Sequence, residues 1–105
     1  MPIMPMKRCV LQIKVTGRVQ GVGFRAYVKA RADEVGVFGW VRNLADGSVH
    51  VLAFLPEERR SSWIESVRRG PPGSMVNSLD IRNLSSEEVP GLSDLREFRI
   101  ERDAE

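Results

Sequence analysis

The sequence predicts an α+β fold, in which an antiparallel sheet of four to five strands carries two helices on one face. Two observations predict this class. Segments in which apolar and polar residues alternate, as in half-buried strands, are interrupted twice by segments with helical periodicity. The order is strand, helix, strand, strand, helix, strand, which defines the ferredoxin-like split βαβ sandwich.

The first strand and helix are predicted from residue periodicity. From Cys9 to Thr16 the odd positions are apolar, which is the period of a strand with one buried face, and the strand ends at Gly17. From Phe24 to Val35 apolar residues recur at helical spacing. Gly36 follows, where a left-handed residue commonly closes a helix. We therefore expect a strand, a glycine-rich loop and a helix in this order.

The next two strands form a predicted hairpin. Segments 37–44 and 49–55 are rich in β-branched and aromatic residues. Between them lies Ala45-Asp46-Gly47-Ser48, whose Asp-Gly pair is a strong short-range signal for a hairpin turn.

The second helix and the last strands complete the order. Pro56 suits the first turn of a helix, and the helix stops at Gly70-Pro71-Pro72-Gly73. A fourth strand is predicted around residues 75–81, followed by a polar loop over 85–94 and a short last strand around 98–100.

The composition of the 105 residues fits one domain, expected at 9–101, with a disordered N-terminal tail at 1–8 and a C-terminal tail at 102–105. Sixteen Lys and Arg against fourteen Asp and Glu leave a formal charge of +2, which gives little support for nucleic-acid binding. An RNA-binding sheet is also disfavoured, because the third strand supplies only Phe54 as an aromatic residue.

Cysteine usage and hydropathy limit the location and the cofactors. Cys9 is the only cysteine, so neither an internal disulfide nor a clustered thiolate zinc site is expected. No run of about 18 apolar residues occurs, so no membrane-spanning helix is expected. We therefore expect a cytoplasmic protein, and no motif in the sequence calls for a cofactor.

The segment from Gly17 to Arg25 is the strongest candidate for a binding site. It places three glycines directly before a helix that carries an Arg in its first turn. Glycine lets successive backbone N–H groups turn inward, and a helix start adds unpaired donors with a partial positive charge, so an anion is the natural ligand. A plain strand-to-helix turn is the alternative, and the local sequence does not separate the two.

The topology brings a second residue to this loop. Strands one and two are joined by a helical crossover and therefore run parallel. The loop after strand one and the far end of strand two then lie at the same edge of the sheet. We expect Arg25 and Asn43 to converge there.

Two segments in register resemble the acylphosphatase family. They are Val19-Gln20-Gly21-Val22-Gly23-Phe24-Arg25 and Gly39-Trp40-Val41-Arg42-Asn43, which are followed by Asp46-Gly47-Ser48-Val49. The resemblance extends less sharply to Arg68-Arg69-Gly70-Pro71-Pro72 and to Phe98-Arg99-Ile100. It covers roughly residues 9–101.

The resemblance implies metal-independent hydrolysis of a carboxyl-phosphate anhydride, giving a carboxylate and inorganic phosphate. Arg25 would hold the phosphoryl oxygens and Asn43 the attacking water. The backbone N–H groups of Val19, Gln20, Gly21 and Val22 would complete the cradle. The substrate is then a small-molecule acyl phosphate.

Two alternatives remain open at this point. The same loop could capture an acyl or carbamoyl phosphate for a partner, as a non-enzymatic binding or regulatory module. Quaternary structure is also open: a monomer is expected, but Leu52 and Phe54 would share the helix-free face of the sheet with Val10. That apolar face would be either exposed or buried in a homodimer.

Overall fold

The elements follow the predicted order in the computed structural model, which describes residues 7–104. In this range the strands are β1 (Arg8–Arg18), β2 (Phe38–Asn43), β3 (Val49–Pro56), β4 (Met75–Leu84) and β5 (Phe98–Ile100). The helices are α1 (Phe24–Val35) and α2 (Arg60–Arg69), and short 3₁₀ turns occur at Glu57–Arg59, Ser86–Glu88 and Leu92–Asp94. The first helix therefore has the predicted bounds, whereas the second begins one 3₁₀ turn later than Pro56 suggested.

The strands form one sheet in the order β4-β1-β3-β2-β5. Pairing is antiparallel among the first four strands of this order, and β5 joins the edge of β2 in parallel. The ferredoxin-like α+β fold is thus confirmed, with a fifth strand whose direction makes the sheet mixed.

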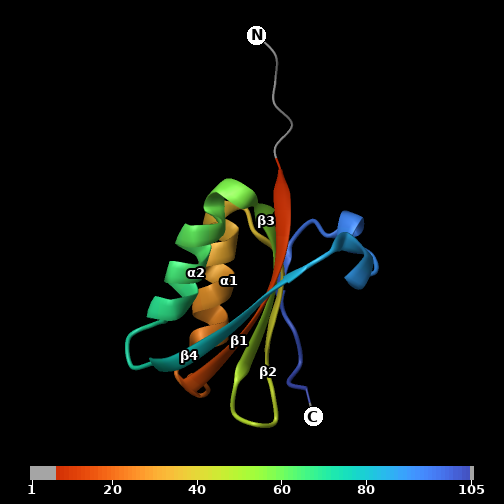
Figure 1. Ribbon diagram of the computed structural model, residues 1–105. Coiled ribbons are helices and arrows are strands. Elements are labelled where there is room, and N and C mark those ends of the chain that lie inside the picture. The colour runs from red at the N-terminus through yellow and green to blue at the C-terminus, as the bar shows by residue number, and fades with distance from the viewer. Residues whose placement is uncertain (1–6, 105) are drawn as a thin grey trace.

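The strand register places the C-terminal ends of β1 and β2 at the same level of the sheet, on either side of β3. Val15 near the end of β1 and Asn43 at the end of β2 both pair with Val49 of β3. Figure 1 shows the loop after β1, the β2–β3 hairpin and the chain that follows β5, up to residue 104, gathered at one end of the molecule. The predicted convergence of the loop and Asn43 follows from this register.

Both helices cover the same face of the sheet, and the main core lies between the two layers (Figure 1). The helices contribute Phe24, Val28, Ala32, Trp63 and Val67, all buried. The strands contribute alternate residues from β1, β2 and β3, as a sheet with one face toward helices requires. These buried strand residues are Leu11, Ile13, Val15, Val41, Val49, Val51, Ala53 and Leu55.

The opposite face of the sheet is covered by the chain itself. Val10 and Leu52 are each only 5% exposed, and they form a second apolar cluster with Leu92. Val89, from the segment expected to be a polar loop, and Leu95, directly after that segment, pack on this cluster. The expectation that Val10, Leu52 and Phe54 leave an apolar face for another chain is therefore wrong, because an intramolecular segment fills that role.

The two ends of the chain differ in what the structure describes. Residues 1–6 of the expected N-terminal tail lie outside the described residues, and Arg8 already begins β1. At the other end, the segment expected to be a tail continues beside β2. The Glu101 amide donates to the Val41 carbonyl at 2.9 Å, and the Ala104 amide donates to the Asn43 carbonyl at 2.8 Å. Residue 103 is consequently held near the end of β2.

Substitution of Gly39 in β2 tests how closely the backbones of β2 and β3 approach each other. Its φ is 138°, and a Cβ atom there would lie 1.9 Å from the Leu52 carbonyl oxygen. We expect Gly39→Ala to lower the free energy of unfolding by roughly 3 kcal/mol or more, because backbone strain adds to a steric overlap. Urea denaturation measures this.

Gly47 provides the matched control, since its φ is 92° but a Cβ atom would meet nothing within 4 Å. Gly47→Ala should reduce stability by only about 1 to 2 kcal/mol. Equal losses in the two variants would contradict the proposed overlap.

Candidate active site

The loop between β1 and α1 presents unpaired backbone donors. Gly21 and Gly23 have φ angles of 74° and 81°, in the left-handed region that glycine enters without strain. Within residues 7–104, the amides of Val19, Gln20, Gly21 and Val22 donate to no other backbone or side-chain group. No side chain caps the start of α1 either. Because buried or turned-in donors normally find partners, this cluster is suited to an anion.

The side chains of the loop hold it in place instead of binding a ligand. Val19 is 1% exposed and packs in the main core. The Gln20 Nε2 atom donates to the carbonyl oxygens of Leu44 at 2.8 Å and Ser48 at 2.9 Å. The loop is therefore anchored on one side to the core and on the other to the β2–β3 hairpin, which leaves its amides free.

The hairpin that receives Gln20 is itself braced. The Asp46 carboxylate accepts hydrogen bonds from the Ser48 amide at 2.9 Å and from the Lys14 ammonium group at 2.8 Å. The hydrogen bond from Lys14, followed by those from Ser48, holds the pKa of Asp46 well below its usual range. A lowered carboxyl pKa stabilises the fold above about pH 4, and this contribution is lost only as the pH falls further.

Arg25 and Asn43 meet in a pocket of about 240 Å³ beside this loop. Arg25 comes from the first turn of α1 and Asn43 from the last position of β2. The pocket is lined by Val19, Gly21, Gly23, Phe24, Arg25, Ala26, Asn43 and Ile100. The structure thus brings both sequence-predicted side chains together with two of the four predicted loop residues, Val19 and Gly21.

Asn43 is buried with an unused acceptor. Only 7% of the residue is exposed, and its Oδ1 atom has no hydrogen-bond partner among the described residues. Its own backbone is fixed on both sides, by Val49 of β3 and by the Ala104 amide. Since buried acceptors are normally satisfied, Oδ1 is available to a donor within the pocket.

Asp103 is a site residue that the sequence did not indicate. Its Oδ1 atom lies 2.9 Å from Nη1 of Arg25. Both side chains are substantially exposed, so the pair contributes little stability, at most about 1 kcal/mol. No local pattern could reveal a contact across so long a stretch of chain. The carboxylate occupies one edge of the guanidinium, and a phosphoryl group would compete with it.

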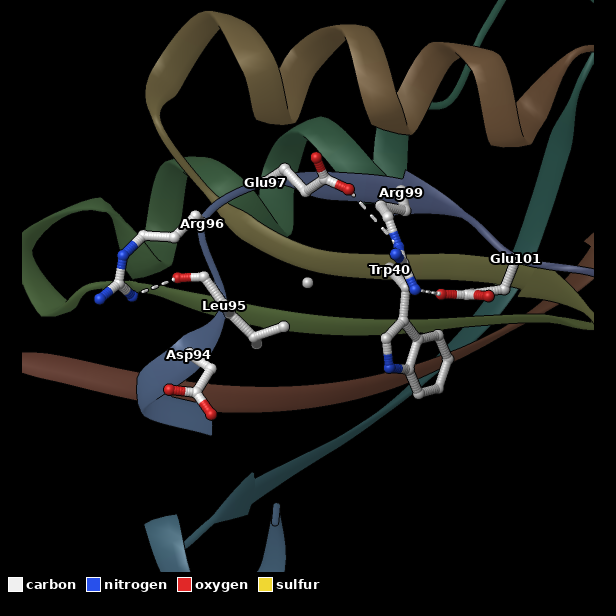
Figure 2. A pocket seen from close by; sticks show the side chains of 8 residues that line it. Trp40, Asp94, Leu95, Arg96, Glu97, Arg99 and Glu101 are labelled. Atoms are coloured by element: carbon white, nitrogen blue, oxygen red, sulfur yellow. Dashed lines mark hydrogen bonds and ion pairs between the residues drawn. The ribbon is translucent and has the colours of Figure 1, made fainter. Parts of the chain in front are cut away.

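A second pocket, of about 260 Å³, lies beside Trp40 and Leu95 (Figure 2). Its two arginines already have partners within the protein. Arg99 forms ion pairs with Glu97 and Glu101, and Arg96 donates to the backbone oxygen of Leu95. This pocket therefore offers an anion far less than the loop does.

His50 lies away from the candidate site, because strand alternation places it on the sheet face opposite its buried neighbours Val49 and Val51. It packs against the Trp40 ring on the helix-free face, with ring centroids 5.1 Å apart. Burial lowers the pKa of His50, and the positive charges of Arg42 and Lys14 lower it further. A neutral imidazole results at pH 7.

Residues 7–104 contain neither a candidate metal-binding cluster nor a candidate membrane-spanning helix. No group of three or more His, Cys, Asp or Glu side chains is arranged to hold a metal ion. Neither helix in this range combines the length and apolar composition that crossing a bilayer requires.

Fold and loop together define a small α+β domain whose first loop presents unpaired amides beside an arginine, and the comparisons name its class. The family model described as Acylphosphatase matches residues 11–100. The chain belongs to the acylphosphatase family, an enzyme family classified as EC 3.6.1.7.

Individual relatives agree with this assignment. An acylphosphatase of Rhizobium etli is 42% identical over 90 residues, covering 86% of this chain and 90% of that protein. One of Rhizorhabdus wittichii is 46% identical over 85 residues, covering 81% of each chain. The crystal structure of acylphosphatase from Bacillus subtilis superposes with a TM-score of 0.80 at 39% identity, over 89% of this chain and 98% of that one.

Replacement of Asp103 tests whether its carboxylate competes for Arg25. We expect Asp103→Asn to strengthen the binding of inorganic phosphate roughly two- to fivefold, because an exposed ion pair no longer has to be broken. Isothermal titration calorimetry measures the affinity.

Asp33→Asn is the matched control, because Asp33 pairs with Lys29 on the surface of α1 and not with Arg25. Its phosphate affinity should stay near that of the wild type. Weaker binding by Asp103→Asn, or an equal gain in both variants, would refute the competition.

Proposed function

We propose that acyl-phosphate hydrolysis takes place in the pocket beside the loop and requires no metal ion. Arg25 and the amides of Val19, Gln20, Gly21 and Val22 bind the phosphoryl group, and Asn43 positions the attacking water. The observation that carries this proposal is the coincidence, in one pocket, of unpaired amides, a guanidinium and a buried unpaired acceptor.

The phosphoryl end of the substrate matches the donors of the loop. A guanidinium stays charged at physiological pH and presents a planar fork to two oxygens. The amides and the positive end of α1 surround the remaining oxygens. In phosphoryl transfer, charge is spread over the three equatorial oxygens, so donors fixed around them stabilise the transition state.

The chemistry needs neither a general acid nor a strong base. Water attacks phosphorus, the bond from phosphorus to the acyl oxygen breaks, and its electron pair leaves with the carboxylate. The conjugate acid of that leaving group has a pKa of about 4, so it departs unprotonated. The Asn43 Oδ1 atom accepts a hydrogen bond from the water and orients it, while a phosphate oxygen takes the released proton.

We also propose an oligomeric state and a cellular location. We propose a monomer, because Val89, Leu92 and Leu95 of the same chain cover the apolar sheet face. The lone Cys9 fits a reducing compartment, and we propose the cytoplasm.

Release of phosphate from benzoyl phosphate, with EDTA present, tests the activity. We expect Arg25→Ala to lower kcat/KM by about 10² to 10³ or more, since one preorganised donor is commonly worth that much and Arg25 also supplies charge. Arg25→Lys should recover little of it, because an ammonium cannot reproduce the fork.

Arg31→Ala is the control, as Arg31 lies on the same helix and pairs with Glu34. It should retain wild-type turnover. Turnover by purified Arg25→Ala at the wild-type rate would remove Arg25 from the mechanism. Phosphate binding without turnover in the wild type would instead favour the binding-module alternative.

Asn43→Ala separates water positioning from phosphate binding. We expect kcat to fall by about 10² while the dissociation constant of inorganic phosphate changes little, because the proposed partner of Asn43 is water. Steady-state kinetics and calorimetry on the same preparation give both quantities. An unchanged kcat would exclude the proposed role.

A further inference from the structure

Ile100 is an unusual feature of the pocket wall. Among the large hydrophobic side chains of residues 7–104, only Met75 and Ile100 are exposed, at 66% and 44%. Ile100 is the last residue of β5 and lines the pocket that holds Arg25 and Asn43. An exposed apolar side chain is ordinary on a surface but informative at the mouth of a binding pocket.

The other lining residues offer little apolar surface. Val19 and Phe24 are 1% and 2% exposed, because their side chains are used in the core. Gly21 and Gly23 have no side chain, and Ala26 contributes a single methyl group. Within the described lining, Ile100 therefore supplies the one large apolar side chain that a ligand can reach.

The position of Ile100 is fixed by the sheet. It pairs with Val41 of β2, two residues before Asn43, so Ile100 and Asn43 point to the same face. The Lys29 ammonium donates to the Phe98 carbonyl at 2.9 Å, which ties β5 to α1. Ile100 is thus presented to the pocket by a paired strand and not by a loop.

We propose that Ile100 forms the acyl subsite, on which the apolar part of the leaving acyl group packs while the phosphoryl group occupies the loop. This rests on the proposed function. The substrate class it selects is an acyl phosphate with an uncharged apolar acyl group, aromatic or branched. Asp103, whose carboxylate lies beside Arg25, would oppose a second negative charge on the acyl group.

The test compares benzoyl phosphate with acetyl phosphate, which share the reacting anhydride and differ in apolar surface. The measured quantity is the ratio of their kcat/KM values. Ile100→Thr and Ile100→Val form a matched pair, because Thr and Val have nearly the same shape, both suit a strand, and only Thr is polar. We expect the ratio to fall roughly five- to tenfold in Ile100→Thr, mainly through KM for benzoyl phosphate, and far less in Ile100→Val.

Met75→Thr is the second control, since Met75 is also a large, exposed apolar side chain but lies on β4, the opposite edge strand. It should leave the ratio unchanged. Equal ratios in Ile100→Thr, Ile100→Val and the wild type would overturn the acyl subsite. Failure of the wild type to hydrolyse either compound would instead overturn the proposed function, so the two failures are distinct.

Discussion

The candidate site depends on one contact, the pair of hydrogen bonds from the Gln20 side chain to the hairpin carbonyls of Leu44 and Ser48. The Gln20 side chain satisfies these two carbonyl oxygens. The backbone amides of the same loop therefore do not have to donate to the hairpin. Val19 is buried on the other side, so the loop between β1 and α1 is fixed while its backbone donors stay unpaired. The side chains of Gln20 and Val19 thus preorganise the loop while its backbone amides stay unpaired.

Leaving several donors unpaired opposes folding, because each unsatisfied group costs about 1 to 3 kcal/mol when it is removed from water. The partly open pocket and the packing behind the loop offset this. Phe24 begins α1 and is almost fully buried in the same core as Val15 and Val49. This packing fixes the start of α1 against the adjacent strand ends. Local departures from full hydrogen bonding are expected at functional sites and are supported by the surrounding core.

Much of this arrangement could be predicted from the sequence, because it follows from periodicity and handedness. The bounds of α1 are marked by Gly23 and Gly36, and the approach of Arg25 to Asn43 follows from the parallel direction of β1 and β2. Segment 85–94 was predicted only as a polar loop, because its apolar residues are sparse and interrupted by Pro90 and Gly91.

The contact of Asp103 with Arg25 was also missed. It depends on the chain after β5 continuing beside β2, which no local signal near residue 103 indicates. The role of Ile100 likewise needs the sheet order, since β5 pairs with a strand far away in the sequence. Contacts of this kind appear only once the strands are placed side by side.

The most direct test of the central claim is a titration of isotopically labelled protein with inorganic phosphate, followed through the NMR resonances of each backbone amide, with EDTA present. The amides of residues 19–22 should shift most and saturate together. Unmoved loop amides, with the largest shifts around Trp40 and Arg96 at the second pocket, would contradict it.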